Sequence, residues 1–322
     1  MNVAMISRWH VHADEYTKIL SEAEGCNVVA VYHEEEEAGK AWAEKVGCKF
    51  VADLNEIWAD ESIDAVAVNA ATNIHPDIIV AAAEAGKAIF TEKVLALTNA
   101  EAERIAAAVK KSGKTFMISY PHLVRPEMIK AKEIMSSGKL GKVSYARVRN
   151  VHNGASAGWL PPHFFSEEQC GGGAMIDLGA HPMYTLAWLL GEPVTIHSTF
   201  TDVTGCGVED NAVSVLTFAC GAIGVSETGF ISTGNPYTLE ISGTEGALMI
   251  HNTLSYCGND TDKQWVEVTD LPEAQPLPCA QFAAIAPKGE QIEEFGIDKA
   301  VRLTKLMDAA YRSYKSGAAA RV

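Results

Sequence analysis

Short apolar segments and longer amphipathic segments alternate along the first 120 residues. The apolar segments lack polar alternation, which is typical of strands covered on both faces. They are residues 2–7, 26–32, 50–51, 64–70, 88–93 and 115–120. The segments between them carry apolar residues at helical spacing, namely residues 12–23, 34–47, 54–60, 75–86 and 99–113. Strands separated by helices of this length pair in parallel through right-handed crossovers. We therefore predict a doubly wound α/β domain of the Rossmann type over residues 1–120.

Beyond residue 120 the pattern changes to alternating strands joined by short turns, which indicates an antiparallel sheet with one buried face. The predicted strands are residues 143–152, 195–204, 211–219, 221–231, 237–244, 246–252 and 263–270. Helical spacing predicts helices over residues 125–141, after the glycines of 171–191, and over 298–317. The Pro- and Gln-rich stretch 271–291 is expected to be an extended loop. We predict an α+β domain over residues 121–322 with a large, open, mainly antiparallel sheet. Its last helix, 298–316, is a candidate to pack back on the first domain.

Composition and charge narrow the class of protein. Of the 322 residues, 48% are hydrophobic and 21% charged, which is ordinary for a folded globular chain. The formal charge of −15 argues against a nucleic-acid or anionic-membrane partner, because both need a basic surface. No apolar run reaches the roughly 18–20 residues that span a bilayer, and the N-terminus does not resemble a signal peptide. Seven scattered cysteines without a CxxC pair indicate a reducing compartment, so we expect a cytoplasmic protein.

The loop after the first strand does not carry the usual dinucleotide fingerprint. A G-x-G-x-x-G turn lets the backbone approach a pyrophosphate, but residues 7–12 contain no glycine. Glu34, which follows the second strand, is either a surface charge or a contact to the ribose hydroxyls. An acid here without a neighbouring Arg favours NAD over NADP. His10 and His12 have the spacing of metal ligands, but no third ligand is evident, so we expect no metal.

Two further segments carry candidate chemistry. Lys93 ends a buried strand, where a lysine is costly to bury unless it is paired or used. Asp177 and His181 are four residues apart, so in a helix they would share one face and could serve one reacting group. The alternative is a capping aspartate and a buried, hydrogen-bonded histidine. Pro182 either kinks this helix or begins a new one.

These residues give the chain a resemblance, over nearly its whole length, to the Gfo/Idh/MocA family of sugar and polyol oxidoreductases. The segments that carry it are Asn73-Ile74-His75-Pro76, Glu92-Lys93 and GGGAMIDLGAHP at 171–182. The resemblance implies a Rossmann domain that binds NAD(H) or NADP(H). It also implies a second domain whose open sheet forms the substrate floor and often the oligomer interface.

The resemblance implies a role for each catalytic candidate. Lys93 hydrogen-bonds and orients the reacting hydroxyl, Asp177 positions the sugar, and His181 takes the hydroxyl proton. Hydride then passes from that carbon to the nicotinamide. The chain departs from the family at Val94, which replaces the proline of the Glu-Lys-Pro motif, and in the shortened loop that lacks glycines. Without that loop the diphosphate would be held by the side chains of Ser7 and Arg8 or by the amides of residues 10 and 11.

The predicted function is NAD(H)-dependent hydride transfer to or from a secondary alcohol or hemiacetal carbon of a sugar, inositol or related polyol, with NADP less favoured. The alternatives are an NAD-dependent glycoside hydrolase that oxidises transiently, and a catalytically idle sugar-binding relative. We expect a homodimer or homotetramer formed through the C-terminal sheet.

The predicted cofactor-binding residues are Ser7, Arg8, Trp9, His10, His12, Glu34, Asn69, Ala70, Thr72, Asn73, His75, Glu92 and Lys93. The predicted substrate-binding residues, whose aromatic, amide and imidazole groups suit a sugar, are Tyr120, His122, Arg149, His152, Asn153, Trp159, Asp177 and His181.

Overall fold

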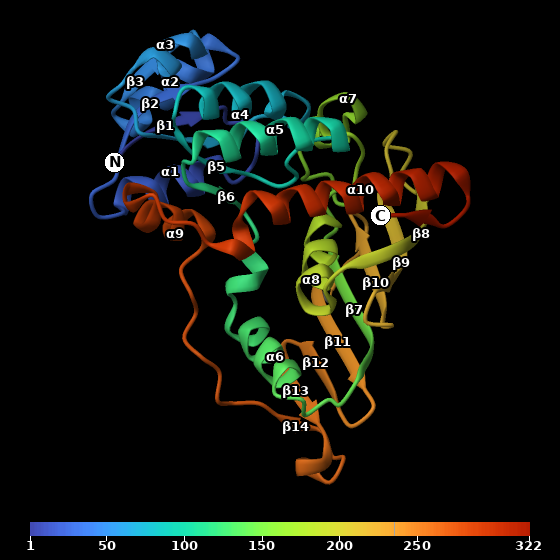
Figure 1. Ribbon diagram of the computed structural model, residues 1–322. Helices are drawn as coiled ribbons and strands as arrows, with labels where there is room; N and C mark the ends of the chain where they lie inside the picture. The colour runs from blue at the N-terminus through green and yellow to red at the C-terminus, as the bar shows by residue number, and fades with distance from the viewer. Residues whose placement is uncertain (235) are drawn as a thin grey trace. The chain divides into compact units, whose positions relative to one another are not determined.

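The computed structural model describes residues 1–234 and 236–322, which form two compact units (Figure 1). The first unit contains Met1–Ser119 and Pro276–Thr304, and the second contains Tyr120–Gln275 and Lys305–Val322. The predicted division at residue 120 adjoins the change of unit after Ser119. The segment 276–304 returns to the first unit, and the long helix α10 (Ile297–Ser316) contributes residues to both units.

The first unit contains the predicted parallel sheet, with strand order β3-β2-β1-β4-β5-β6. Its strands are β1 (Asn2–Ile6), β2 (Asn27–Tyr32), β3 (Lys49–Val51), β4 (Ala65–Val68), β5 (Ala88–Thr91) and β6 (Phe116–Ile118). The connecting helices are α1 (Ala13–Glu22), α2 (Glu36–Val46), α3 (Leu54–Ala59), α4 (His75–Glu84) and α5 (Asn99–Ser112), with the 3-10 turn η1 (Thr72–Ile74) before α4. All residues of β4, β5 and β6 are buried, as expected for strands covered on both faces. The predicted doubly wound fold is confirmed.

The prediction of a loop over 271–291 is wrong for part of that stretch. Helix α9 (Pro278–Ile285) lies within it, followed by a 3-10 turn, η5 (Ala286–Lys288), and a further turn, η6 (Glu293–Phe295), comes before α10. Pro278 occupies the first turn of α9, where a missing N–H costs nothing. The side chain of Phe282 is fully buried, and its ring centroid lies 5.8 Å from that of Phe90 on β5. Packing against the first unit therefore stabilises a helix that local composition did not indicate.

The second unit contains a nine-stranded sheet with strand order β14-β13-β12-β11-β7-β10-β9-β8-β15. Among the described residues of this unit, only β7 and β10 pair in parallel, so the predicted mainly antiparallel sheet is confirmed. The strands are β7 (Val143–Val151), β8 (Pro193–Thr201), β9 (Asn211–Phe218), β10 (Ile223–Gly229), β11 (Tyr237–Gly243), β12 (Ala247–His251), β13 (Thr253–Cys257), β14 (Val266–Glu267) and β15 (Ala320–Arg321). Strand β13 was not predicted, and β14 is shorter than the predicted 263–270.

One face of this sheet is buried against helix α8 (Ala180–Leu190), which packs on β7 and β10. The remaining elements of the unit are the helices α6 (Pro126–Ser136) and α7 (Glu167–Cys170) and the 3-10 turns η2 (Pro121–Val124), η3 (Pro162–Phe165) and η4 (Asn259–Thr261). On the opposite face the apolar side chains of Val213, Val215 and Ile223 are exposed. A homodimer or homotetramer through this sheet stays a prediction. No helix among the described residues has both the length and the apolarity that crossing a bilayer requires.

Candidate active site

The carboxyl ends of the parallel strands meet at one edge of the first sheet. Ile6 on β1 pairs with Tyr32 on β2 and with Val68 on β4, which in turn pairs with Thr91 on β5. The residues that directly follow these strands therefore lie along one edge. The strand order reverses between β1 and β4, and ligands of doubly wound sheets bind in the crevice at such a reversal.

The loop from β1 to α1 is held by its own side chains in place of glycines. Ser7 adopts a φ of 66°, in the left-handed region that glycine usually occupies. Its N–H donates to the carbonyl of Tyr32 at 2.8 Å, and its hydroxyl donates to Glu34 Oε2 at 2.8 Å. The N–H of Trp9 donates to the Ser7 hydroxyl at 3.2 Å. Ser7 therefore connects the loop to the candidate ribose-binding acid.

Three of the four groups predicted to hold the diphosphate, the side chains of Ser7 and Arg8 and the amide of His10, have partners within the protein. The guanidinium of Arg8 donates to both carboxylate oxygens of Asp14, at 2.7 and 2.6 Å. The hydrogen bond from Arg8 is the main cause of the lowered pKa of Asp14, to which Lys45 also contributes. The N–H of His10 donates to the carbonyl of Asn69 at 3.0 Å. A bound diphosphate would have to compete with these contacts or use other groups.

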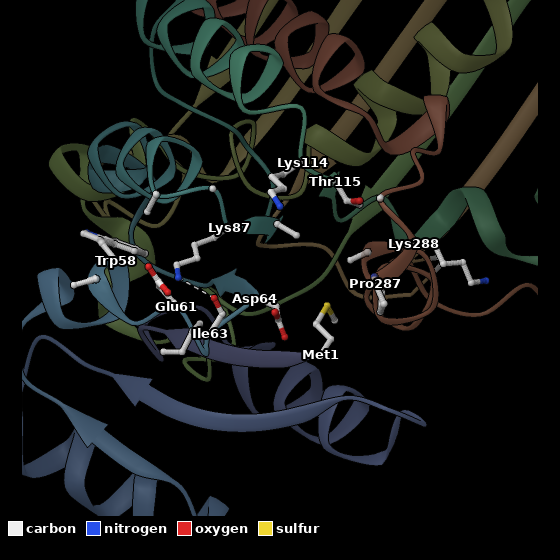
Figure 2. Close-up of a pocket in the computed structure, with 16 residues that line it drawn as sticks. Met1, Trp58, Glu61, Ile63, Asp64, Lys87, Lys114, Thr115, Pro287 and Lys288 are labelled. Atoms are coloured by element: carbon white, nitrogen blue, oxygen red, sulfur yellow. Dashed lines mark hydrogen bonds between the residues drawn. The ribbon is translucent and has the colours of Figure 1, made fainter.

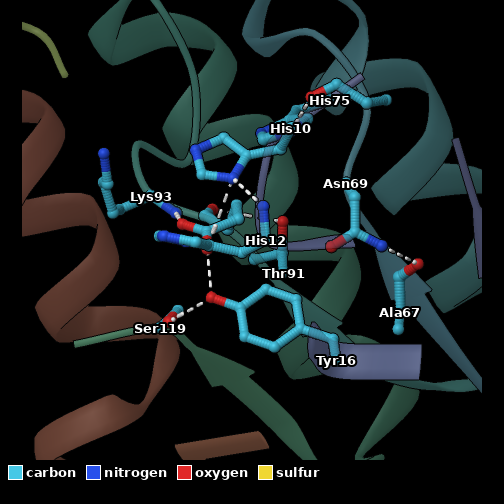
Figure 3. Close-up of polar contacts among 11 residues, drawn as sticks. His10, His12, Tyr16, Ala67, Asn69, His75, Thr91, Lys93 and Ser119 are labelled. Atoms are coloured by element: carbon cyan, nitrogen blue, oxygen red, sulfur yellow. Dashed lines mark hydrogen bonds and ion pairs between the residues drawn. The ribbon is translucent and has the colours of Figure 1, made fainter. Parts of the chain in front are cut away.

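Glu92, which follows β5, is the centre of a buried polar cluster, and its partners His12 and Tyr16 are labelled in Figure 3. Its Oε1 accepts from the hydroxyl of Tyr16 and lies 3.0 Å from His12 Nδ1 and 3.7 Å from His10 Nδ1. Its Oε2 accepts from the backbone N–H of Lys93 at 3.0 Å. Burial opposes ionisation of this carboxyl, but the charges of His10, His12 and Lys93 and the hydrogen bond from His12 prevail, so its pKa is well below the usual range.

Two members of this cluster, Tyr16 and Ser119, are not among the residues predicted from the sequence. The Tyr16 hydroxyl lies 2.9 Å from Ser119 Oγ as well as contacting Glu92 (Figure 3). Tyr16 was counted among the apolar positions of its helix, because periodicity shows which face is buried and not which polar atom finds a partner. The contact spans 103 residues of sequence, so no local signal indicates it.

Next to this cluster, the backbone after β4 and β5 is held by His75. Its Nδ1 lies 3.1 Å from the Val94 carbonyl, and its Nε2 lies 3.0 Å from the Ala70 carbonyl. The imidazole is buried, which lowers the pKa of His75 despite these contacts. His75 thus connects the backbone after β4 to the backbone after β5.

Two buried acceptors near the same edge favour a ligand with hydrogen-bond donors. Asn69 Oδ1 and Asn73 Oδ1 are buried and have no donor among the residues that the structure describes. Buried acceptors without a partner are costly unless a ligand or water satisfies them. A dinucleotide carries hydroxyl and carboxamide donors, so these groups fit one, while the loop 7–12 departs from the usual diphosphate cradle.

Lys93 is buried, with 6% of its surface exposed, at the position predicted for the orienting ammonium. Its peptide bond to Val94 is cis. The side chain of Lys93 extends away from the imidazole of His10 (Figure 3).

In the second unit, the predicted helical face that joins Asp177 and His181 is wrong. Helix α8 begins at Ala180, and Asp177 lies in the preceding turn, where its N–H donates to the Gly173 carbonyl at 3.1 Å. Pro182 lies in the first turn of α8. A proline is tolerated there because the backbone N–H that it lacks would have no partner within the helix. Asp177 is half-buried and His181 is buried.

His181 lies in an aromatic cluster of the second unit. Its Nδ1 is 2.8 Å from the hydroxyl of Tyr184, whose ring stacks on that of Tyr120 with centroids 4.2 Å apart. The ring of His122 lies edge-on to His181 at 4.8 Å and stacks on Tyr237 at 4.3 Å. The structure therefore brings the predicted residues Tyr120, His122 and His181 together.

The other predicted substrate residues lie in two places. His152 stacks on Phe230 with centroids 5.0 Å apart and contacts Trp159, whose indole N–H donates to Asn153 Oδ1 at 3.0 Å. Arg149 lies on β7 among positions that alternate with the buried Asn150, so it points to the face opposite α8. The structure does not bring Arg149 together with His181.

The glycine-rich turn before Asp177 is anchored by Glu209, which the sequence analysis did not single out. Glu209 Oε1 accepts from the N–H groups of Gly173 and Met175 at 2.9 and 3.0 Å and from the Tyr311 hydroxyl at 2.5 Å. A Cβ at Gly173 would lie 2.2 Å from the Glu209 carbonyl oxygen, and one at Gly172 would lie 2.0 Å from the Tyr311 hydroxyl. Close approach of these groups explains why glycines occupy this turn.

A cavity of about 790 Å³ lies elsewhere in the first unit (Figure 2). Its lining includes Asp64, Ala88 and Thr115, which stand at the amino ends of β4, β5 and β6. The buried Lys87 there donates to the carbonyls of Asp60 and Ile63 at 2.6 and 2.8 Å, which gives it a structural role. Because ligands of such sheets bind at the carboxyl ends, this cavity is not the candidate active site.

Both parts of the chain match one family. Residues 2–120 match the oxidoreductase family with an NAD-binding Rossmann fold, and residues 128–249 match the GFO/IDH/MocA C-terminal domain. The chain is 30% identical to scyllo-inositol 2-dehydrogenase (NAD(+)) of Bacillus subtilis (strain 168) over 283 residues, 84% of this chain and 80% of the relative. It is 28% identical to 1,5-anhydro-D-fructose reductase of Ensifer adhaerens over 242 residues, 72% of this chain and 71% of the relative.

Solved structures share the fold. A levoglucosan dehydrogenase in complex with NADH and levoglucosan has a TM-score of 0.88 at 21% identity, covering 100% of this chain and 99% of that one. The order of strands, the paired domain matches and the inositol dehydrogenase relative define an oxidoreductase with a Rossmann domain. The chain belongs to the GFO/IDH/MocA family of oxidoreductases.

Proposed function

We propose that the protein is an NAD(H)-dependent dehydrogenase that oxidises a secondary alcohol or hemiacetal carbon of a sugar, inositol or related polyol, or reduces the corresponding carbonyl. The observation that carries the proposal is the match of both units to one oxidoreductase family whose named relatives act on sugars and inositols. The position of the buried Lys93 at the carboxyl end of β5 supports it, because that edge is where a doubly wound sheet binds its cofactor.

The residues of the first unit would hold the cofactor and orient the substrate. Glu34 would accept hydrogen bonds from the ribose, and the orphaned acceptors Asn69 Oδ1 and Asn73 Oδ1 would accept from other donors of the dinucleotide. The ammonium of Lys93 would donate to the reacting oxygen and stabilise negative charge as it develops. The nicotinamide, when bound, supplies or accepts the hydride.

The residues of the second unit would bind the sugar and move the proton. His181 would take the hydroxyl proton, since an imidazole has a pKa close to neutral and suits general base catalysis. The Tyr184 hydroxyl at His181 Nδ1 fixes the orientation of the ring. Asp177 would accept hydrogen bonds from sugar hydroxyls next to the reacting one.

Two substitutions test these catalytic roles. Lys93→Met and His181→Ala should each lower turnover at least about 100-fold, because each removes one positioned orienting or proton-transfer group. Initial rates of NADH formation with a panel of inositols and aldoses measure the effect. Lys114→Met and His197→Ala, which alter exposed side chains, serve as matched controls and should keep turnover. Near-normal turnover of both active-site variants would contradict the mechanism, and sugar cleavage without net NADH would favour the hydrolase.

The preference for NAD depends on Glu34. Its carboxylate would repel the 2′-phosphate of NADP, so NADH should bind at least about tenfold more tightly than NADPH, a difference of ~1.4 kcal/mol. Fluorescence titration of the two reduced cofactors measures this ratio. Glu34→Gln should lower the ratio of the NADH affinity to the NADPH affinity. Glu35→Gln, which alters the next exposed acid, should leave this ratio unchanged. Equal affinity of the unchanged protein for both cofactors would refute the preference.

A further inference from the structure

Three metal-binding side chains converge where the β1–α1 loop meets the end of β5. His10, His12 and Glu92 each place one ligand atom within 4.8 Å of the others. The sequence predicted no metal because only the two histidines are neighbours. The structure supplies the third ligand, Glu92, from 80 residues beyond His12. We propose that these three residues bind a divalent transition-metal ion. The proposal concerns the protein without its cofactor, because the same side chains are among the predicted cofactor contacts.

The distances suit an ion of this class. Bonds of about 2.0–2.2 Å from zinc to imidazole nitrogen and carboxylate oxygen place neighbouring ligand atoms about 3.4 Å apart in a tetrahedron. The Glu92 Oε1 atom lies 3.0 Å from His12 Nδ1 and 3.7 Å from His10 Nδ1. These two separations lie on either side of the tetrahedral value. The nitrogens of the two imidazoles lie no more than 4.8 Å apart, so the rings would have to rotate toward each other to bind one ion.

The ligands are held by neighbouring groups that an ion would not displace. The backbone of His10 is fixed by its hydrogen bond to Asn69, and Glu92 is fixed through Oε2 by the N–H of Lys93. The Tyr16 hydroxyl donates to Glu92 Oε1, the kind of support that metal-ligating carboxylates commonly have. His10 and Glu92 have 6% and 2% of their side-chain surface exposed, so the ion would be partly shielded from water.

The ring of His10 has a neutral form that suits a metal ligand. In that form His10 Nδ1 accepts from the backbone N–H of His12 at 3.3 Å, and the proton is on Nε2. A neutral imidazole with an unprotonated nitrogen is the form that binds a metal. The side chain of His12 is 39% exposed, so one side of the site stays open.

The ligand set indicates the class of ion and leaves a coordination position for another ligand. Two histidines and one glutamate are the ligands of several zinc sites that keep one position for water or substrate. Two neutral imidazoles and one carboxylate give the occupied site a single positive charge. Imidazole favours first-row transition metals over Mg²⁺ and Ca²⁺, so the proposed site should discriminate against those ions.

A second group of candidate ligands does not make a comparable site. Asp202, Cys206 and Asp210 also lie within reach of one another. However, both oxygens of Asp202 accept from the N–H groups of Cys206 and Gly207, and both oxygens of Asp210 accept from loop N–H groups. These carboxylates stabilise a loop, and this group carries no proposal.

The test measures Zn²⁺ and Co²⁺ binding to the full chain after treatment with a chelator. Calorimetry should show one ion per chain with micromolar or tighter affinity, and Co²⁺ should develop visible absorption typical of four or five ligands. Cys206→Ala serves as the background, because it removes one of the three candidate ligands of the second group. Mg²⁺ should not compete at equal concentration.

Substitutions of the ligands decide the assignment. His10→Ala and His12→Ala should each weaken Zn²⁺ binding at least about 100-fold, more than the 10–100-fold typical of losing a supporting hydrogen bond. Tyr16→Phe should retain one ion per chain with a loss in that smaller range, and His33→Ala should bind as the background does. His10→Gln keeps a polar side chain in the loop and replaces His10→Ala if that variant does not fold. Zn²⁺ binding no tighter than millimolar, or unchanged binding after substitution of His10, would overturn the proposal.

Discussion

Each unit contains a glutamate that organises the segment next to its candidate catalytic residue, and this side chain is buried at Glu92 and half-buried at Glu209. Glu92 lies beside Lys93 in the first unit, and Glu209 holds the glycine-rich turn before Asp177 in the second. Both accept a hydrogen bond from a tyrosine hydroxyl and at least one from a backbone N–H. The pKa values of the two carboxyl groups are nevertheless shifted in opposite directions.

The difference arises from the charge of the partners. Burial is the largest influence on both carboxyl groups and acts to raise the pKa of each. At Glu209 it prevails, because the partners are the neutral Tyr311 hydroxyl and backbone N–H groups, and the pKa is raised. At Glu92 the charges of His10, His12 and Lys93 reverse the result, and the pKa is lowered.

Hydrogen bonds from neutral donors therefore do not offset the effect of burial on the pKa of Glu209. Neutral donors satisfy the oxygens of Glu209 but leave the charge only partly compensated. Cationic neighbours favour the ionised form of Glu92. The ionised carboxylate in turn stabilises the imidazolium and ammonium groups around it. The arrangement around Glu92 is therefore stabilised by the charge of its carboxylate. The arrangement around Glu209 is stabilised mainly by close packing and hydrogen bonds.

Replacing each glutamate with glutamine should separate the two cases. Glu92→Gln removes a charge from a buried ionic cluster and should lower the free energy of unfolding by about 2–3 kcal/mol. Glu209→Gln keeps a carbonyl oxygen for the same donors and should cost less than about 1 kcal/mol. Urea unfolding in the presence of a chelator measures both changes.

The matched controls are Glu84→Gln on α4 and Glu267→Gln on β14, which alter exposed side chains and should change stability by less than about 0.5 kcal/mol. If Glu209→Gln destabilised the protein as much as Glu92→Gln, the contrast between charged and neutral partners would be wrong.

The sequence predicts the elements around these glutamates better than it predicts their partners. The parallel strands and helices of the first unit follow from local periodicity, which depends on residues a few positions apart. Helix α9 was missed because proline and glutamine surround the apolar residues Cys279 and Phe282, which are buried in tertiary contacts. Strand β13 has only five residues and follows β12 after one residue, so it gave no separate signal.

The site was predictable where a motif is contiguous and not where contacts are remote. Lys93 was singled out because it directly ends a strand. The Tyr16 contact to Glu92 spans 76 residues, and the Glu209 contact to Tyr311 spans 102, so neither has a local pattern. The prediction that one helix carries both Asp177 and His181 was wrong because helical spacing was applied to a turn. In that turn, Glu209 accepts from the N–H groups of Gly173 and Met175, and α8 begins only at Ala180.

The smallest expected effect is a difference in pH dependence. Because the folded-state pKa of Glu209 lies above its ordinary value of 4.5, the folded state holds this proton more tightly than the unfolded chain does. The contribution of Glu209 to stability is therefore complete below pH 4.5 and is lost as the pH rises through the folded-state pKa. Relative to Glu209→Gln, which cannot titrate, the unchanged protein should lose stability over this range by no more than about 1.4 kcal/mol per pH unit. Urea unfolding of both proteins at steps from pH 4 to pH 8 (~0.5 unit apart) measures this difference. Taking the difference cancels the titration of every other group, so parallel curves for the two proteins would show that neutral donors compensate the half-buried charge of Glu209 after all.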